Sequence, residues 1–525
     1  GGGAGGPTPE DCAGLECIQR YAAHVDPEFG WVDTGVRRTG FVWIADGEIV
    51  RWTAYVLNVT SIRYLAPGET NVPVWWHPTV VVVPSNLDAS NRDFATFNIG
   101  GASQVYQFLE DPELLSFACP DIEGTIQLAV RTGNIAAAFL LVPNQPVVFA
   151  DDPARERMTE DVWKAYAEAH AYKEPARVGW IPVLAMAKSA MRGMDAVADF
   201  ARRVLPSGEL RRFAVAGCSK RGMASWWVGL LDSRVKAIMP CCIAIDMKVN
   251  MEHLAESMGS FPFALAEYQR RGLLRQREPL PDPVDFVDRL TMPKLVMTVS
   301  NDMFFPPDTV NLYFSRLQGP KTLFEVANMD HQGSLTMLNF IPAMVPFVRD
   351  VARRREAPVI TWTIENVTGT ITVTQVSRHR PVSVIAWSTR TCNGRRRDFR
   401  FWNMDGPEHC ARCGGTLRAV ADVPAQPGFD GPAVAATCLV PIAWIPAPAQ
   451  ETRPGTWRLA LPPPADGWAA FYLHFVYAGE GGREPHQMTT EVSVVPQTYP
   501  FPGCGATPSP CADNELVLLD RRAPR

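Results

Sequence analysis

The sequence predicts an α/β domain followed by an all-β domain, because its hydrophobic period changes along the chain. Between about 96 and 335, short apolar runs alternate with helical patterns, which is typical of a mostly parallel sheet flanked by helices. After Pro358 apolar and polar residues alternate, as in Ile360–Ile364 and Ile371–Val376, which indicates short antiparallel strands. A length of 525 residues also favours two or three domains over one.

These patterns predict how the chain is divided. Residues 1–14 are glycine-rich and expected to be flexible, 15–355 form the α/β domain, 356–498 form an immunoglobulin-like β-sandwich, and 499–525 form a proline-rich tail. Within the α/β domain, residues 250–290 break the alternation of strand and helix. We expect them to form a lid over the edge of the sheet.

The elements of the α/β domain follow in order. A short helix is expected at 15–23, and the antiparallel strands expected next are 41–43, 49–56 and 80–83. A buried strand at 96–99 then stops at Gly100 and Gly101. The later helices are expected at 160–170, 180–204, 222–231 and from 309 through Leu317, and the later strands at 213–218, 235–239, 293–300 and 322–327.

Composition limits the classes of partner. Apolar residues make up 46% of the chain and charged residues 20%, as in ordinary globular proteins. Lys and Arg total 50 against 55 Asp and Glu, and the cluster Arg395–Arg397 is too short for a polyanion site, so we expect no nucleic acid partner. No apolar run approaches 18 residues, so we expect no membrane span. No dinucleotide-binding or phosphate-binding glycine motif is present, and no cofactor is expected.

The cysteines and two glycosylation triplets predict a secreted or extracellular protein. Of twelve cysteines, those expected in disulfides lie in polar, loop-like segments: Cys12, Cys17, Cys392, Cys410, Cys413, Cys438, Cys504 and Cys511. Those expected as packed thiols lie in or beside apolar segments: Cys119, Cys218, Cys241 and Cys242. Asn58 and Asn366 begin N-x-Thr triplets and are candidate glycosylation sites. The chain starts at Gly1 without a Met, so we expect a processed product that lacks its targeting segment.

A zinc site is the alternative for one group of these cysteines. Cys410 and Cys413 have the spacing of a zinc knuckle, and Cys392 and Cys438 could complete a four-thiolate set. Only one C-x-x-C pair is present, so disulfides are favoured and no metal is expected.

The stretch Gly217-Cys218-Ser219-Lys220-Arg221-Gly222 joins a strand to an apolar helix, which is the setting of a nucleophile elbow. Ser219 is therefore the candidate nucleophile. Gly217 precedes it by two residues, but Arg221 stands where G-x-S-x-G has its second glycine, so the match is imperfect. An ordinary strand-to-helix turn is the alternative interpretation.

Asp302 and His331 are the partners expected for Ser219. Each follows a predicted parallel strand, and the chain order Ser, Asp, His is that of α/β-hydrolases. Such a triad needs a base beside the hydroxyl and an acid that orients the base. Asp246 is an alternative acid, because it follows the strand after the nucleophile helix. Asp308 is expected to cap the helix that follows it.

The oxyanion hole is expected to use the amide of Lys220 and an amide from Gly101 or Ala102. The side chains of Lys220 and Arg221 either bind an anionic substrate group or form salt bridges with a neighbouring helix. A dipeptidyl-peptidase-like activity would need carboxylates for a free amino terminus. The candidates for that task are Glu160, Asp161, Glu252 and Glu256.

Several motifs resemble one known family. They are Gly217–Gly222, Val142–Pro146, Pro293–Lys294 with Asn301–Asp308, Asn328–His331, Arg397–Arg400, and Gly467–Phe471 with Thr489–Thr490. Together they resemble the PhoPQ-activated pathogenicity-related protein family over most of the chain. The resemblance implies an α/β-hydrolase domain with a C-terminal β-sandwich, often exported, with a poorly defined substrate. It also implies the triad Ser219, Asp302 and His331.

The chain departs from that family's pattern at Cys218, where a small residue is common, and at the Asn328–His331 turn. Glucuronoyl esterases are a weaker resemblance, and they keep Asp246 open as the acid. We expect a secreted serine hydrolase that cleaves a small-molecule ester or peptide through an acyl-enzyme. The alternative is an extracellular signalling or adhesion protein that uses a hydrolase fold to bind a cell-surface partner.

Overall fold

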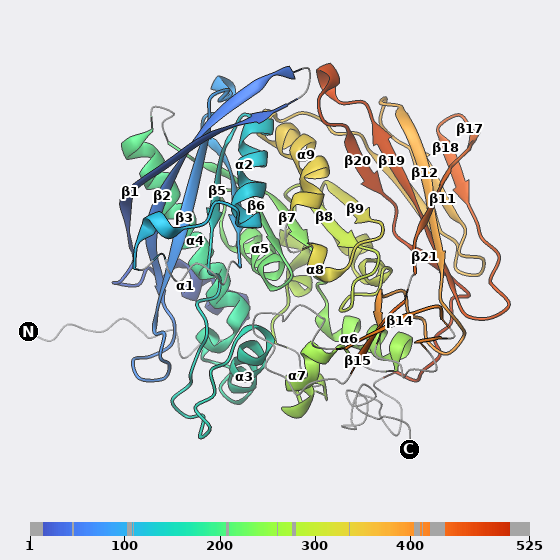
Figure 1. Ribbon diagram of the computed structural model, residues 1–525, viewed down its shortest axis with the longest axis horizontal. Coiled ribbons are helices and arrows are strands. Elements are labelled where there is room, and N and C mark those ends of the chain that lie inside the picture. The colour runs from blue at the N-terminus through green and yellow to red at the C-terminus, as the bar shows by residue number, and fades with distance from the viewer. Residues whose placement is uncertain are drawn as a thin grey trace, which may run out of the picture. The chain divides into compact units, whose positions relative to one another are not determined.

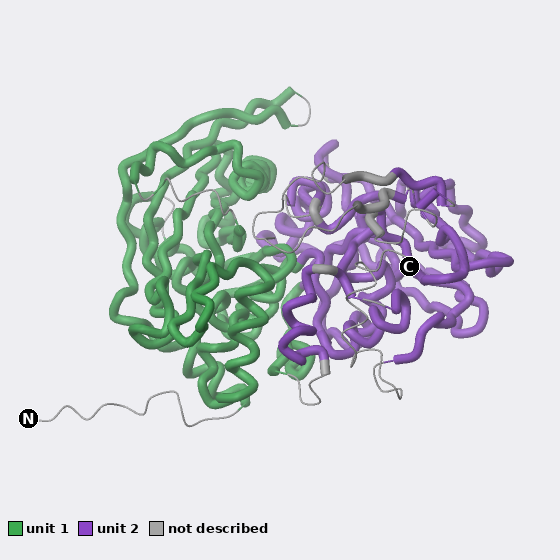
Figure 2. The backbone as a smooth tube through the Cα atoms, turned by 60° about the horizontal axis from the view of Figure 1, so that its bottom comes forward, with its two compact units in different colours: residues 1–240, 278–293 green, residues 241–277, 294–525 purple. Residues whose placement is uncertain are grey.

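The computed structural model groups the chain into two compact units, Gly1–Pro240 with Glu278–Pro293, and Cys241–Arg277 with Lys294–Arg525 (Figure 2). The residues that it describes are 14–44, 47–101, 108, 110–205, 209–259, 261–275, 280–334, 337–403, 410–411, 413–419, 436–440 and 442–503.

The first unit contains a sheet with the strand order β1-β2-β3-β5-β4-β6-β7. Its strands are β1 (Gly30–Trp43), β2 (Ile49–Arg63), β3 (Val74–Pro84), β4 (Phe94–Ile99), β5 (Ile135–Phe139), β6 (Arg212–Cys218) and β7 (Val235–Cys241). The first three are antiparallel, whereas β4 pairs in parallel with β5 and β6. The expected antiparallel start and parallel centre are confirmed, and β1 and β2 are longer than the sequence indicated.

Helices flank this sheet, and its central strands are buried along their whole length: all six residues of β4 and all five of β5 are buried. The helices are α1 (Gly14–Ala23), α2 (Pro120–Thr132), α3 (Glu160–Lys173), α4 (Pro182–Val204) and α5 (Lys220–Leu231) (Figure 1). Helix α4 approaches the sheet closely at Gly193, where a Cβ atom would lie 2.7 Å from the ring of Phe139.

The second unit begins with helices and a parallel strand pair. The elements are α6 (Met247–Met258), α7 (Ala266–Arg270), β8 (Lys294–Val299), β9 (Lys321–Val326), α8 (His331–Ser334) and α9 (Ile341–Arg353). Strands β8 and β9 pair in parallel from Lys294 and Lys321 onward. The helix expected through Leu317 is instead two short 3₁₀ turns, Thr309–Leu312 and Phe314–Arg316, because the backbone of Tyr313 between them is not helical. The lid function of 250–290 stays a prediction.

Two antiparallel sheets follow in the second unit, as the alternating pattern predicted. The first is β10 (Ile360–Ile364), β11 (Ile371–Gln375), β18 (Thr456–Leu459) and β17 (Glu451–Arg453). The second is β16 (Ile445–Pro448), β12 (Pro381–Arg390), β19 (Ala469–Tyr477) and β20 (His486–Thr489), with β21 (Ser493–Val495) on β19. A small third sheet contains β13 (Trp402–Asn403), β15 (Ala436–Leu439) and β14 (Thr416–Ala419).

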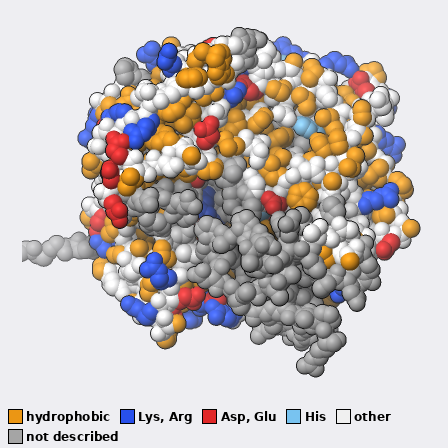
Figure 3. All heavy atoms as spheres, viewed as in Figure 1, with side chains coloured by type: hydrophobic (Ala, Val, Ile, Leu, Met, Phe, Trp, Pro, Cys, Tyr) orange, Lys and Arg blue, Asp and Glu red, His pale blue; other side chains and the backbone are white. Residues whose placement is uncertain are grey.

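The two larger sheets share one apolar core. Val373 and Trp457 of the first sheet pack with Phe471 and Phe475 of the second, and the rings of Trp457 and Phe475 meet edge to face at 5.2 Å. The described chain therefore has an α/β part, with parallel strands and helices, followed by a C-terminal all-β part. None of the helices in the described ranges is long and apolar enough to cross a membrane. On the face in Figure 3, acidic and basic side chains are interspersed among apolar ones.

The cysteines correct one expectation. Cys392 and Cys413 form a disulfide, and Cys17 and Cys410 are also disulfide-bonded, as predicted. Cys119 and Cys242 take part in no disulfide. The prediction of packed thiols at Cys218 and Cys241 is wrong, because both are disulfide-bonded. Each ends an apolar strand, β6 or β7, and an apolar sequence context does not reveal which strand ends meet across a sheet.

Cys12, Cys438, Cys504 and Cys511 lie outside the described residues. The four-thiolate zinc site is not formed, because a sulfur in a disulfide such as Cys392–Cys413 is no thiolate. Among the residues that the structure describes, no group of three or more His, Cys, Asp or Glu side chains is placed to hold a metal ion.

Candidate active site

Ser219 occupies a strained turn between β6 and α5. Its φ is 54° and its ψ is −129°, a region that a residue with a side chain rarely adopts. At Gly217 a Cβ atom would lie 2.5 Å from the carbonyl oxygen of Arg221, so only glycine fits where the strand meets the helix. This is the backbone geometry of a nucleophile elbow, with Arg221 accommodated at the position of the second glycine.

Asp302 and His331 form a buried pair in the second unit. The Nδ1 atom of His331 lies 2.7 Å from Oδ2 of Asp302, and the two residues are 4% and 2% exposed. Asp302 Oδ1 accepts hydrogen bonds from the amides of Phe304 and Phe305, at 2.7 and 3.2 Å. These bonds fix the carboxylate, and a proton on Nδ1 makes Nε2 the basic nitrogen of the imidazole.

The carboxylates of Asp246 and Asp308 have other partners. Asp246 pairs with Arg316 at 2.8 Å. Asp308 does not cap a helix with its side chain, contrary to expectation, because its carboxylate binds Arg397 and His253. The charge of Arg397 outweighs the effect of burial and lowers the pKa of Asp308 far below its usual range.

Aromatic side chains surround the imidazole. The ring of Phe304 meets His331 edge to face at 4.6 Å between centroids, and Phe305 lies at 6.1 Å. Both phenylalanines are only partly buried. A partly exposed apolar wall therefore borders the imidazole.

The glycine turn after β4 is held by neighbouring backbone. The amide of Gly100 donates to the carbonyl of Phe139 at 2.8 Å, and the amide of Val142 donates to the carbonyl of Gly100 at 3.1 Å. Gly101 follows directly, whereas Ala102 lies outside the described residues. The turn therefore has a defined position within the first unit.

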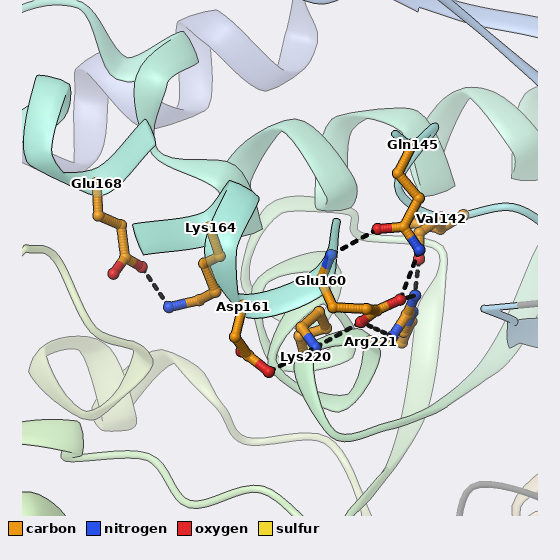
Figure 4. Close-up of polar contacts among 8 residues, drawn as sticks. All are labelled: Val142, Gln145, Glu160, Asp161, Lys164, Glu168, Lys220 and Arg221. Carbon is orange, nitrogen blue, oxygen red and sulfur yellow. Dashed lines mark hydrogen bonds and ion pairs between the residues drawn. The ribbon is translucent and has the colours of Figure 1, made fainter. Parts of the chain in front are cut away.

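The side chains of Lys220 and Arg221 form salt bridges with helix α3, which is one of the two alternatives left open by the sequence (Figure 4). Lys220 Nζ lies 2.6 Å from Glu160 and 3.4 Å from Asp161, and the guanidinium of Arg221 lies 3.0 Å from Glu160. Lys220 and Arg221 are buried. Burial alone would raise the pKa of Glu160, but the charges of Arg221 and Lys220 hold it well below its usual range.

This cluster changes two sequence-based interpretations. The cations are neutralised by Glu160 and Asp161, so they do not present charge to an anionic substrate. For the same reason these carboxylates are not available to hold a free amino terminus. A salt bridge to a neighbouring helix was expected as one alternative, but Glu160 could not be identified as the partner, since Glu160 and Lys220 are 60 residues apart.

The two sequons differ in exposure. Asn58 lies within β2, opposite Val32 of β1 and Pro78 of β3, and its Oδ1 atom is buried. Asn366 is exposed in the turn between β10 and β11. Only the second site is open to an enzyme that acts on the folded chain.

The model of the PhoPQ-activated pathogenicity-related protein family matches residues 38–400, which include Ser219, Asp302 and His331. The autocrine proliferation repressor protein A of Dictyostelium discoideum is 27% identical over 478 residues, covering 87% of this chain and 88% of that protein.

Two of the solved structures that this chain resembles, each with a TM-score of 0.37, are esterases. Acetyl xylan esterase 1 from Thermoanaerobacterium sp. JW/SL YS485 is 14% identical, with a TM-score of 0.37 over 62% of this chain and 92% of its own. The glucuronoyl esterase from Solibacter usitatus is also 14% identical, with a TM-score of 0.37 over 63% of this chain and 91% of its own.

Proposed function

The chain belongs to the PhoPQ-activated pathogenicity-related protein family, and from that premise we propose that it is a secreted serine hydrolase acting through an acyl-enzyme. Ser219 is the nucleophile, His331 the general base and Asp302 the acid that orients the imidazole. The observation that supports this most strongly is the strained backbone of Ser219, with φ of 54°, at a strand-to-helix turn where glycine is obligatory two residues earlier.

The positions of the three residues support the same triad. Ser219 follows β6, Asp302 follows β8 and His331 follows β9, each beyond the carboxyl end of its strand. In α/β folds, catalytic groups gather at this end of the strands. Ser219 belongs to the first unit and the other two residues to the second, so the proposal requires the Ser219 hydroxyl to meet Nε2 of His331 in the active protein.

The reaction follows from these roles. Nε2 of His331 takes the proton of the Ser219 hydroxyl as its oxygen attacks the substrate carbonyl, and the imidazolium is stabilised by Asp302. The oxyanion that forms accepts hydrogen bonds from the amides of Lys220 and of Gly101 or Ala102. The imidazolium then protonates the leaving group, and water, activated by the same histidine, hydrolyses the acyl-enzyme.

The substrate is an ester or a peptide without a strongly charged group near the scissile bond. The charges of Lys220 and Arg221 are neutralised by Glu160 and Asp161, and Phe304 and Phe305 border the imidazole with apolar surface. Secretion is supported by the Cys392–Cys413 disulfide and by the exposed sequon at Asn366.

A second candidate function comes from the Dictyostelium relative, whose name describes repression of proliferation. In this case the chain would be an extracellular signalling protein that binds a cell-surface partner with little or no catalysis. Sequence identity of 27% over 87% of the chain is the observation in its favour.

Labelling of the folded protein by a fluorophosphonate distinguishes the two functions. The hydrolase is expected to label at Ser219, and labelling should be lost in Ser219→Ala and His331→Ala. Ser225→Ala is the matched control, because Ser225 is buried in α5 and its hydroxyl donates to the carbonyl of Gly222. This variant should label like the wild type.

A separate sample of unlabelled wild-type protein is assayed with acyl esters and with amino-terminal dipeptide amides, which separates esterase from peptidase activity. A folded wild type that neither labels nor hydrolyses any of these compounds would contradict the hydrolase and favour the binding protein.

A further inference from the structure

Glu160 lies at the centre of the charged cluster in Figure 4, and its carboxylate contacts three side chains. Oε1 accepts hydrogen bonds from Arg221 at 3.0 Å and from Gln145 at 2.6 Å. Oε2 accepts from Lys220 at 2.6 Å and from Arg221 at 3.1 Å. The carboxylate is thus bound on both oxygens, which is more than a simple helix-to-helix salt bridge needs.

The backbone of Glu160 is strained at the same point. Its φ is 45°, which is unfavourable for a residue with a side chain. The amide of Glu160 donates to Oε1 of Gln145 at 2.8 Å, so Gln145 binds both the main chain and the side chain of Glu160. Strained residues persist where their surroundings fix them, and they concentrate at functional sites.

Arg221 connects this carboxylate to the glycine turn after β4. Its Nε atom donates to the carbonyl of Val142 at 2.5 Å, and the amide of Val142 holds the carbonyl of Gly100. The guanidinium also packs on Gly101, where a Cβ atom would lie 3.1 Å from Cζ of Arg221. Arg221 therefore touches the turn directly and through Val142.

Lys220 supplies the other connection. It is the first residue of α5, and its amide is the first donor of the proposed oxyanion hole. Its ammonium group is bound by Glu160. One carboxylate thus holds both side chains that anchor the two proposed amide donors, one at the start of α5 and one in the turn after β4.

We propose that Glu160 and Arg221 are positioning residues that hold the amides of Lys220 and Gly101 in the geometry of an oxyanion hole. The inference rests on the proposed hydrolase function. A buried ion pair adds little net stability over apolar residues of the same volume, because desolvation offsets the attraction, so its fixed geometry is the property that matters here. Loss of one oxyanion donor typically lowers kcat by about 10²–10³.

The test compares Glu160→Gln and Arg221→Lys with Lys188→Met. Lys188 forms an even more deeply buried ion pair with Asp26 at 2.7 Å in the same unit, and it contacts neither the elbow nor the glycine turn in the described residues. Glu160→Gln and Lys188→Met each remove one charge from an ion pair, and Arg221→Lys keeps the charge but loses the guanidinium contacts. All three variants should therefore lose thermal stability to a similar degree. Two readouts are taken: amide hydrogen exchange in peptides 94–101 and 212–223, and kcat and KM for an acyl ester.

We expect faster exchange in both peptides for Glu160→Gln and Arg221→Lys, with kcat about 10–100-fold lower and KM within about threefold. Lys188→Met should leave the exchange of these peptides and kcat unchanged. The double variant should be no worse than the worse single one, because the two residues act as a unit.

Each contrary result has a separate meaning. Exchange like that of Lys188→Met in both peptides, or equal losses of kcat in all three variants, would overturn the positioning role. A wild type that neither labels nor turns over would refute the hydrolase function, and hydrogen exchange would still decide whether Glu160 and Arg221 hold these amides.

Discussion

His331 points Nδ1 at Oδ2 of Asp302 across 2.7 Å, and the same carboxylate is fixed by two backbone amides. This arrangement sets the tautomer and the orientation of the imidazole before any substrate binds. Asp246, the alternative acid, is instead paired with Arg316. Replacing Asp302 or Asp246 should therefore affect catalysis differently.

Asp302→Asn should lower kcat by about 10³–10⁴, because the imidazole would lose the partner that selects its tautomer. Asp246→Asn should stay within about threefold of the wild type. Rates of fluorophosphonate labelling and of ester hydrolysis measure both. The reverse ranking of the two variants would make Asp246 the acid.

Gly217→Ala should destabilise the protein by about 1–3 kcal/mol or more and abolish labelling of Ser219, since the new methyl group would collide with the carbonyl of Arg221. Gly30→Ala, at the start of β1, is the control, because a Cβ atom there has no neighbour within 4 Å. Urea unfolding and labelling are measured for both. Normal labelling of a folded Gly217→Ala protein would disprove the elbow.

Burial raises the pKa of Glu325 to about 8, from 4.5. Between these values the folded protein keeps a proton that the unfolded chain has lost, so its free energy of unfolding falls with rising pH by about 1.4 kcal/mol per unit. In the Glu325→Gln variant the side chain carries no proton that could be lost between these pH values. Its stability relative to the wild type should therefore rise from pH 5 to pH 8 and then level off, as measured by urea unfolding; parallel curves for the two proteins would contradict the shift.

Expression through a eukaryotic secretory pathway should attach a glycan at Asn366 and none at Asn58, because Asn58 lies in β2 between β1 and β3. Intact mass spectrometry before and after glycosidase treatment, with Asn366→Gln as control, measures this. A glycan that persists in Asn366→Gln would show that Asn58 is modified before the strand pairs.

Alkylation of the denatured but unreduced protein should modify Cys119 and Cys242 and leave Cys218 and Cys241 unmodified. Peptide mapping identifies the labelled positions. Modification at Cys218 would restore the original interpretation of a packed thiol beside Ser219.

Local pattern was enough for much of the fold. The change from a helical to an alternating hydrophobic period predicted the parallel strands and the antiparallel sheets that follow. It could do so because the spacing of apolar residues along the chain shows which faces of a helix or strand are buried. The strand-to-helix switch around Ser219 was visible for the same reason. The helix expected after Asp308 was wrong, because the backbone of Tyr313 is not helical, and the partner of the Asp308 carboxylate, Arg397, could not be predicted because it is 89 residues away.

Local sequence pattern shows which residues stand at the ends of strands, and hence identifies Ser219, Asp302 and His331 as candidates in the order Ser, Asp, His. The partners of the charged side chains depend instead on how the chain folds: Asp302 pairs with His331, Asp246 with Arg316, and Glu160 with Lys220 and Arg221. The reason is physical. Strand ends follow from local hydrophobic period, whereas a buried charge is stabilised by whichever opposite charge folding brings within about 3 Å.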